Sequence, residues 1–349
     1  MNASFAPDRQ AGHGNGPRFP AEWEPCEAVW LAWPHNRSTW PGRFEPILPA
    51  MAHFAERIAE STPVRVLVGD RHVRDCRQHV AAIDGVDLVP IDTDDCWVRD
   101  YGPVFVIEDG ELVGVDFRFN AWGGRYQPYG KDAAAGRQMC QHAGIRRRGA
   151  TLTVEGGALE TDGQGRLLAN PACFIDPKRN PGLTKEAVSR AMYQLLGITE
   201  IVWIDGGVLA GDDTGGHIDQ LARFLDPENV VVSVASDPTD EAAEGLRNNF
   251  LQLDLWSTQT SPEVTVHQLP TPPPRRIEGQ RVPESYCNFL RLGPERLLVP
   301  TFHHDPTDSD ALDRLTQWCP GVDVVGVPCE DLVWGLGALH CASSHQPAT

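Results

Sequence analysis

The chain has 349 residues, of which 41% are hydrophobic and 22% are charged, and this composition is typical of a globular protein rather than a disordered one. Its length allows a substantial core, in one large domain or in two smaller ones. The formal net charge of −18 argues against nucleic acid or an anionic membrane as a partner and favours cations. An acidic surface that only keeps the protein soluble is the alternative.

The nine cysteines show no C-x-x-C pair and no regular spacing. No N-terminal apolar stretch resembles a signal peptide, and no apolar run reaches the roughly 18 residues that a membrane span needs. We therefore expect reduced, mostly buried thiols in a cytoplasmic protein that is not inserted in a membrane.

Residues 1–17 are rich in Gly, Asn, Pro and Ala without periodicity and are predicted to form a disordered tail. From Phe19 onward, short apolar runs alternate with helical patterns. The expected elements, in chain order, are a strand at 64–68, a helix at 71–80, a strand at 86–90, a helix at 185–196, a strand at 201–204, a surface loop at 270–274, a helix at 309–318 and a strand at 322–327.

Strand–helix–strand units of about 60 to 70 residues recur about five times, which indicates an α/β protein built from repeated modules. No G-x-G-x-x-G follows the first strand, so a dinucleotide site is not supported. Polar residues recur at a similar spacing. Asp100 and Glu155 are 55 residues apart, Glu155 and His217 are 62 apart, and His217 and Cys341 are 124 apart, which is twice 62. A closed ring of such units would bring these residues to a shared axis.

Cys341 is a candidate nucleophile because small neighbours, among them Gly337, Ala338 and Ser343, would let a substrate approach. Nucleophilic attack needs the thiolate, so the site must lower the thiol pKa from about 8.5 or bind a cation that does so. A buried core cysteine is the alternative.

His217 and Asp219 stand two residues apart, as on a strand, where alternate side chains share one face. Gly215 and Gly216 precede them and would let the backbone approach a ligand closely. Histidine is the natural acid and base near neutral pH. The alternative is a metal pair, but no second His or Cys stands at ligand spacing, and we expect no metal.

Two further carboxylates belong to the candidate site. Asp100 precedes Gly102-Pro103, where an aspartate usually caps a turn. Glu155 ends an apolar run, so we expect it to be partly buried, which is costly without a partner. Three acids around one pocket, counting Asp219, repel one another unless a cation enters. A planar guanidinium matches carboxylates best because it donates in bidentate pairs.

Short motifs occur in order along nearly the whole chain: Phe19–Pro25, Leu31–Pro34, Asp95–Pro103, Phe119–Gly124, Glu155–Gly157, Gly216–Asp219, Tyr286–Phe289 and Leu339–Cys341. Together they resemble the agmatine deiminase family, which includes the bacterial-type peptidyl-arginine deiminases, within the guanidine-modifying pentein superfamily. The resemblance implies a five-fold pseudosymmetric α/β-propeller of strand–helix–strand modules around a central active site. Residues 18–349 would then form a single catalytic domain.

The resemblance also implies roles for the candidate residues. Cys341 would attack the guanidinium carbon, and Asp100 and Asp219 would bind the guanidinium nitrogens. His217 would protonate the departing ammonia and then activate water against the covalent thiouronium, while Glu155 would orient His217 and the substrate nitrogens. No metal or organic cofactor would be needed.

The implied reaction is hydrolysis of agmatine to N-carbamoylputrescine and ammonia, a step of putrescine and polyamine biosynthesis. Two segments depart from the family pattern: Gly215 replaces the Asn of T-N-G-H, and Ala342–His345 replaces I-T-Q-Q. Chemistry on a guanidine is therefore a safer expectation than agmatine itself. The alternatives are a deiminase of arginine or peptidyl-arginine, and a non-catalytic or metal-dependent cation-binding protein.

The expected substrate-binding residues are Trp97, Trp122, Asp213 and Asn288. Asp213, together with Asp212, would face the distal ammonium of agmatine, and a tryptophan would pack against its methylenes. The alternative is that both acids are solvated loop residues. The oligomeric state is left open by the sequence, and a homodimer is compatible with it.

Overall fold

A computed structural model describes residues 16–260 and 262–349. The predicted disordered tail therefore lies almost entirely outside the described residues. The backbone of Arg18 makes two hydrogen bonds with Ile107, of 2.9 and 2.8 Å, and so joins the start of the fold to a strand. Among the described residues, no helix combines the length and the apolar character that a membrane crossing requires.

The described strands form five sheets of three or four strands and one two-stranded sheet. Each of the five sheets contains one antiparallel pair. The pairs are β18 (Ser343–Pro347) with β1 (Cys26–Ala32), β4 (Val104–Glu108) with β5 (Glu111–Arg118), β7 (Glu160–Thr161) with β8 (Arg166–Ala169), β10 (Ala222–Asp226) with β11 (Asn229–Val234), and β15 (Leu290–Leu292) with β16 (Arg296–Thr301).

A third strand joins each pair in parallel. These strands are β2 (Val64–Leu67), β6 (Arg146–Thr153), β9 (Glu200–Trp203), β12 (Thr265–Pro270) and β17 (Asp323–Pro328). Beside β2, the first sheet gains a fourth strand, β3 (Val86–Val89). The small sheet is the hairpin of β13 (Arg276–Ile277) and β14 (Gln280–Arg281).

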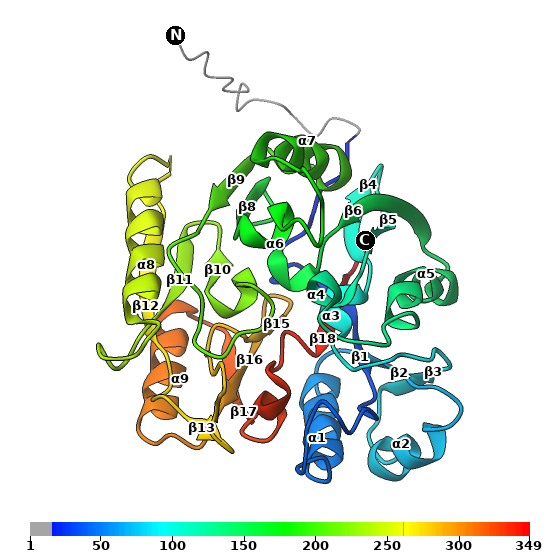
Figure 1. Ribbon diagram of the computed structural model, residues 1–349. Coiled ribbons are helices and arrows are strands. Elements are labelled where there is room, and N and C mark those ends of the chain that lie inside the picture. Colours follow the sequence, from blue (N-terminus) through cyan, green and yellow to red (C-terminus); the bar gives the residue numbers. More distant parts are fainter. Residues whose placement is uncertain (1–15, 261) are drawn as a thin grey trace.

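Helices supply the crossovers that parallel strands require, and Figure 1 shows the long ones on the outside of the molecule with the strands inside. The longer helices are α1 (Ile47–Ala59), α2 (Val73–Val80), α5 (Asp132–Ala143), α7 (Lys185–Leu196), α8 (Ala243–Ser257) and α9 (Thr307–Trp318). Single turns are α3 (Val98–Tyr101), α4 (Ala121–Gly124), α6 (Ala172–Ile175), η1 (Gly156–Ala158), η2 (Ile218–Gln220) and η3 (Leu332–Gly335).

Helix α7 illustrates why the local sequence folds as it does. The side chain of Thr184 accepts a hydrogen bond from the Ala187 N–H, and Gly197 ends the helix in the left-handed region at φ 74°. Val188, Met192 and Leu196 are buried on one face at helical spacing. The prediction of a helix at 185–196 is confirmed.

The protein is thus a mixed α/β protein, as predicted. The repeating unit needs one correction, because an antiparallel strand pair precedes the helix and the parallel strand in four of the units, and in the first unit the C-terminal strand β18 completes the pair with β1. The sequence showed only strand, helix and strand. The other predicted helices and strands are found within a few residues of their expected bounds, and the chain leaves β12 at Pro270, where the Pro-rich loop was predicted.

Candidate active site

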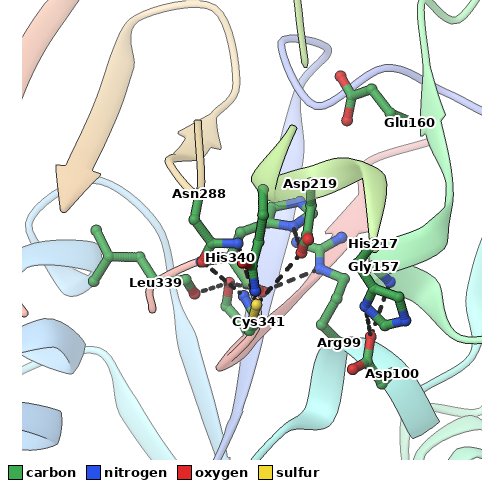
Figure 2. Close-up of polar contacts among 12 residues, drawn as sticks. Arg99, Asp100, Gly157, Glu160, His217, Asp219, Asn288, Leu339, His340 and Cys341 are labelled. Atoms are coloured by element: carbon green, nitrogen blue, oxygen red, sulfur yellow. Dashed lines mark hydrogen bonds and ion pairs between the residues drawn. The ribbon is translucent and has the colours of Figure 1, made fainter. Parts of the chain in front are cut away.

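The five candidate catalytic residues come from four separate parts of the chain and meet in the interior. Each is at most 5% exposed. Figure 2 shows four of them, Asp100, His217, Asp219 and Cys341. Asp100 lies in α3, and Glu155 immediately precedes η1. His217 precedes η2, Asp219 lies in η2, and Cys341 lies in the turn before β18.

The imidazole of His217 lies between two carboxylates. Its Nδ1 is 3.6 Å from Oδ1 of Asp100, and its Nε2 is 3.5 Å from Oε2 of Glu155. On the other side of the cluster, Sγ of Cys341 lies 3.6 Å from Oδ2 of Asp219. Gly157 lies between the two halves, because a Cβ there would lie 2.6 Å from Nδ1 of His217 and 3.0 Å from Oδ2 of Asp219, so the thiol, the imidazole and the three carboxylates form one group.

The predicted strand at His217 and Asp219 is wrong. Asp219 lies in the 3-10 turn η2, and His217 immediately precedes it. Gly215 and Gly216 reach this turn with φ of 91° and 95°, a left-handed conformation that glycine adopts without strain. The glycines allow a tight turn where alternating strand geometry was expected.

Asp212 fixes this glycine turn from within. Its Oδ1 accepts hydrogen bonds from the N–H and the hydroxyl of Thr214, and its Oδ2 accepts from the N–H groups of Gly215 and Gly216 at 3.1 and 2.7 Å. Both oxygens already accept hydrogen bonds within the turn, so Asp212 is placed to hold the turn, and its contact with a ligand stays a prediction. It is a turn-capping residue.

A cavity of about 600 Å³ reaches this group at Cys341 and Asp100, whereas Glu155, His217 and Asp219 are not among the residues of its wall. Cys341 and Asp100 contribute to its wall, together with three of the predicted substrate-binding residues, Trp97, Trp122 and Asp213. The cavity is acidic but is also lined by aromatic rings. It therefore suits a ligand that has both a positive charge and an apolar stem.

Contacts with neighbouring residues fix Trp122, Trp97 and Asp213 in the cavity wall. Trp122 donates from Nε1 to Oδ2 of Asp100 at 2.8 Å, which orients that carboxylate. The Trp97 ring packs so closely on Gly337 that a Cβ there would lie 2.5 Å from it. Asp213 accepts a hydrogen bond from the hydroxyl of Tyr126, and burial, the largest effect, raises its pKa.

Asn288 is placed differently from the other predicted substrate-binding residues. Its Nδ2 donates to Sγ of Cys341 at 3.1 Å, and its Oδ1 accepts from the backbone N–H groups of His340 and Cys341 at 3.1 and 3.3 Å. Asn288 thus holds the thiol and the turn that carries it, and it does not belong to the cavity wall.

The pKa values of His217 and Asp100 are both raised, but for different reasons. Burial opposes a charge on His217, but Asp100 and Glu155 raise the pKa of this imidazole to about 9. Burial also raises the pKa of Asp100 to about 6, with Asp219 and Glu155 adding to the effect of burial. The neighbouring carboxylates thus favour the imidazolium form of His217, whereas burial favours the neutral form of Asp100.

The pKa of the Cys341 thiol is raised well above its usual value, first by burial and then by Asp219 and Asp100. The donor group of Asn288 opposes this effect. Without a ligand, therefore, the site favours the neutral thiol. A cation between the two aspartates would reverse the largest Coulombic contributions and favour the thiolate.

Sequence reasoning missed Arg179, which holds Glu155 in place. The guanidinium Nε of Arg179 lies 2.8 and 3.0 Å from the two oxygens of Glu155, and Nη2 donates to the carbonyl of Thr214 at 2.6 Å. Although burial alone would raise the pKa of Glu155, His217 and Arg179 lower it. The cost of burying Glu155 predicted that a cation must be near, but no motif indicated which one.

Sequence reasoning also assigned no role to His340 and Glu22, although both lie within the quoted motifs. The two ring nitrogens of His340 contact Asp219 and Glu22 at 2.8 and 2.9 Å. In the described part of the chain, no group of three or more His, Cys, Asp or Glu side chains is arranged to share a metal ion.

The fold shows the class of protein to which the chain belongs. The chain has the mixed α/β fold of the pentein-type amidinotransferases and deiminases. An amidinotransferase from Microseira wollei superposes with a TM-score of 0.51 over 94% of this chain and 96% of that chain at 14% identity, which shows the fold alone.

Residues 18–347 match the family described as Porphyromonas-type peptidyl-arginine deiminase, and the chain belongs to this family. A protein of Pectobacterium atrosepticum, provisionally named agmatine deiminase, is 32% identical and is aligned over 99% of both chains. The agmatine deiminase of Enterococcus faecalis superposes with a TM-score of 0.87 at 29% identity, covering 95% of this chain and 96% of that chain.

Proposed function

We propose that the chain is a hydrolase that converts agmatine and water to N-carbamoylputrescine and ammonia. The observation that carries the proposal is the thiol of Cys341 at an acidic cavity, with Asp219 3.6 Å away and Asp100 in the same wall. The agmatine deiminase names of the relatives from P. atrosepticum and E. faecalis support it.

The guanidinium binds between Asp100 and Asp219. Trp122 donates to Oδ2 of Asp100 and the Gly157 N–H donates to its Oδ1, while His340 contacts Oδ2 of Asp219. Oδ1 of Asp219 is buried and has no hydrogen-bond partner among the described residues, so it is free to accept from a ligand N–H. Buried carboxylates that repel one another gain a cationic partner in this way, which favours guanidinium over neutral ligands.

The bound cation then activates the nucleophile. Its charge offsets that of Asp219 and Asp100, so the thiol of Cys341 loses its proton to solvent and the thiolate attacks the guanidinium carbon. A C–S bond forms, and the imidazolium of His217 protonates one NH2 group. The C–N bond to that group breaks, ammonia leaves, and a covalent thiouronium remains.

Hydrolysis of the thiouronium restores the site. His217, now neutral, takes a proton from water while the water oxygen bonds to the same carbon. The C–S bond then breaks, the carbon becomes the ureido carbon of N-carbamoylputrescine, and Cys341 is released. Glu155, itself held by Arg179, fixes the imidazole through both steps.

Substrate choice rests on the outer part of the cavity. Asp213 faces the distal ammonium of agmatine, while Trp97 and Trp122 pack against the methylenes. The carboxylate of arginine would meet Asp213 with like charge, which disfavours arginine. The raised pKa of Asp213 supports a carboxylate that gains from a cation nearby.

Peptidyl-arginine is the second candidate substrate. The family description supports it, and a cavity of about 600 Å³ is large for a small amine because pockets of roughly 300–1,000 Å³ hold drug-sized ligands. Ammonia release from agmatine, arginine and a blocked arginine peptide tests both candidates. Preferential turnover of the peptide would overturn agmatine, and no release from any guanidine would overturn deiminase activity altogether.

We also propose that residues 18–349 form one catalytic domain in which the five strand–helix units close into a five-fold propeller. The shared strand pattern of the five sheets and the pairing of β18 with β1 support this arrangement. Limited proteolysis should leave a single core that begins near residue 18. Two stable fragments would contradict the proposal.

We also propose that the protein is cytoplasmic. The nine cysteines are free thiols, which supports a reducing, cytoplasmic environment. A homodimer is proposed as the assembly, and its mass can be measured by light scattering. A monomeric mass at micromolar concentration would refute the dimer.

A further inference from the structure

His340 precedes the candidate nucleophile in sequence but contacts a different set of groups. Its Nδ1 lies 2.8 Å from Oδ2 of Asp219, a contact within the group drawn in Figure 2, and its Nε2 lies 2.9 Å from Oε1 of Glu22. The side chain is 1% exposed. A neutral imidazole has one donor, so the ring can donate to both carboxylates only as the imidazolium.

Glu22 is a fixed anion at the far end of this contact. Arg99 and Arg223 donate to its two oxygens from Nη2 at 2.8 and 2.9 Å. Burial alone would raise the pKa of Glu22, but His340, Arg99 and Arg223 hold it well below its usual range. Arg223 is held in turn by Glu160 at 2.7 Å and by two backbone carbonyls.

Asp219 and Asp100 are both buried acids of one site, yet they behave in opposite ways. Burial raises the pKa of Asp100, whereas the pKa of Asp219 is lowered because His340, followed by His217 and Arg223, outweighs burial. Of these three groups, His340 is the one that bonds directly to Asp219. The titratable and charged groups facing Asp219 are His340 and Cys341 from the segment before β18, His217 from the turn before η2, Arg223 from β10 and Asp100 from α3.

We propose that His340, anchored by Glu22, is a positioning residue that fixes Asp219 through Oδ2 and leaves its Oδ1 free for the substrate guanidinium. Oδ2 of Asp219 is taken by His340, and Oδ1 has no partner in the described part of the structure. His340 acts through Asp219 and does not touch the reacting atoms. The inference rests on the proposed function and names the groups that prepare its binding site.

The test is His340→Gln in the full chain, because glutamine can keep a hydrogen bond but not the charge. Loss of a charge-assisted bond corresponds to a rise of about ten- to a hundredfold in KM for agmatine at pH 7. The turnover number kcat should fall much less than KM rises. On the acid side of the kcat/KM profile, below the limb that Asp100 sets, activity should fall more steeply than in wild type, since Asp219 would then take up a proton more readily.

Two further variants separate positioning from general damage. Glu22→Gln keeps an acceptor for Nε2 but removes the anchoring charge, so its KM should fall between those of wild type and His340→Gln. His267→Gln is the matched control. His267 bonds Asn229 at 2.8 Å and stacks on Trp318 away from the site, so this change should leave the pH profile and KM as in wild type.

A carboxyl ¹³C NMR titration supplies a readout that does not need turnover. The Asp219 signal is assigned by its loss in Asp219→Asn. In His340→Gln it should titrate about one pH unit or more above its wild-type position, the equivalent of a tenfold change. If His340→Gln does not fold, the same titration on Glu22→Gln decides, with an upward shift again expected.

An unshifted Asp219 signal, or a folded His340→Gln whose KM and acid limb match wild type, would overturn the inference and leave His340 a packing residue. These outcomes differ from failure of the proposed function. In that case wild type itself would release no ammonia from agmatine, whatever the Asp219 titration showed.

Discussion

An alanine at position 157 would place a methyl group where the site has no room. Built on the backbone, the added Cβ lies 2.6 Å from Nδ1 of His217, 2.8 Å from Oδ1 of Asp100 and 3.0 Å from Oδ2 of Asp219. Favourable contacts between heavy atoms begin near 3.5 Å, so His217 and Asp100 must each move by more than half an ångström, on the order of 0.7–0.9 Å.

The displacement acts on the groups assigned to binding and proton transfer. A misplacement of about 1 Å in such groups can cost about a hundredfold in rate, so we expect kcat/KM for agmatine to fall roughly ten- to a hundredfold. Overpacking should also lower the free energy of unfolding by about 1–3 kcal/mol. Gly157 has no left-handed backbone that would add a conformational penalty, so the effect is steric.

Steady-state ammonia release and thermal unfolding of Gly157→Ala measure both quantities. Gly130→Ala is the control, because a Cβ there meets no atom within 4 Å and the residue has no positive φ. If Gly157→Ala kept more than half of the wild-type kcat/KM with an unchanged Tm, the close contacts around His217 would not control the reaction.

Further changes test the assigned roles. Cys341→Ala should abolish turnover while the fold and agmatine binding persist, and residual turnover above about a hundredth of wild type would contradict a covalent nucleophile. His217→Ala should slow both formation and hydrolysis of the thiouronium in rapid-quench experiments, whereas Asp219→Asn should mainly weaken binding; equal effects would refute this division. The kcat/KM profile should be bell-shaped, because Asp100 is protonated below its pKa of about 6 and His217 loses its proton above about 9; a flat profile across pH 6 would count against Asp100. Asp213→Asn should lower the preference for agmatine over arginine by up to about fivefold, and an unchanged ratio would remove Asp213 from substrate choice.

The elements that the sequence predicted best are those whose cause is local. Helix α7 has its cap, its apolar face and its terminal glycine within the residues 184–197, so the pattern alone defines its bounds. The meeting of Asp100, Glu155, His217, Asp219 and Cys341 was expected from their recurring spacing and from the family resemblance. Their roles stay predictions until variants are measured.

What the sequence could not predict depends on contacts between distant segments. Glu155 and Arg179 stand 24 residues apart, and His340 and Glu22 stand 318 apart, so no local pattern joins either pair. The residues His217 and Asp219 were assigned to a strand because a spacing of two fits a strand. The glycines before them permit a turn equally well, and in the structure Asp212 accepts hydrogen bonds from the N–H groups of both glycines and so holds that turn.

The pairing of β18 with β1 joins the two ends of the chain. Trp30 and Gln346, which are hydrogen-bonded to each other, stand 316 positions apart in the sequence. Cys341 lies in the turn directly before β18, so its position depends on one of the longest loop closures in the molecule. Contacts of this kind form late, because much chain entropy must be lost before they form. Recovery of thiol chemistry during refolding should therefore lag behind the recovery of helical structure, and activity should report the completed fold.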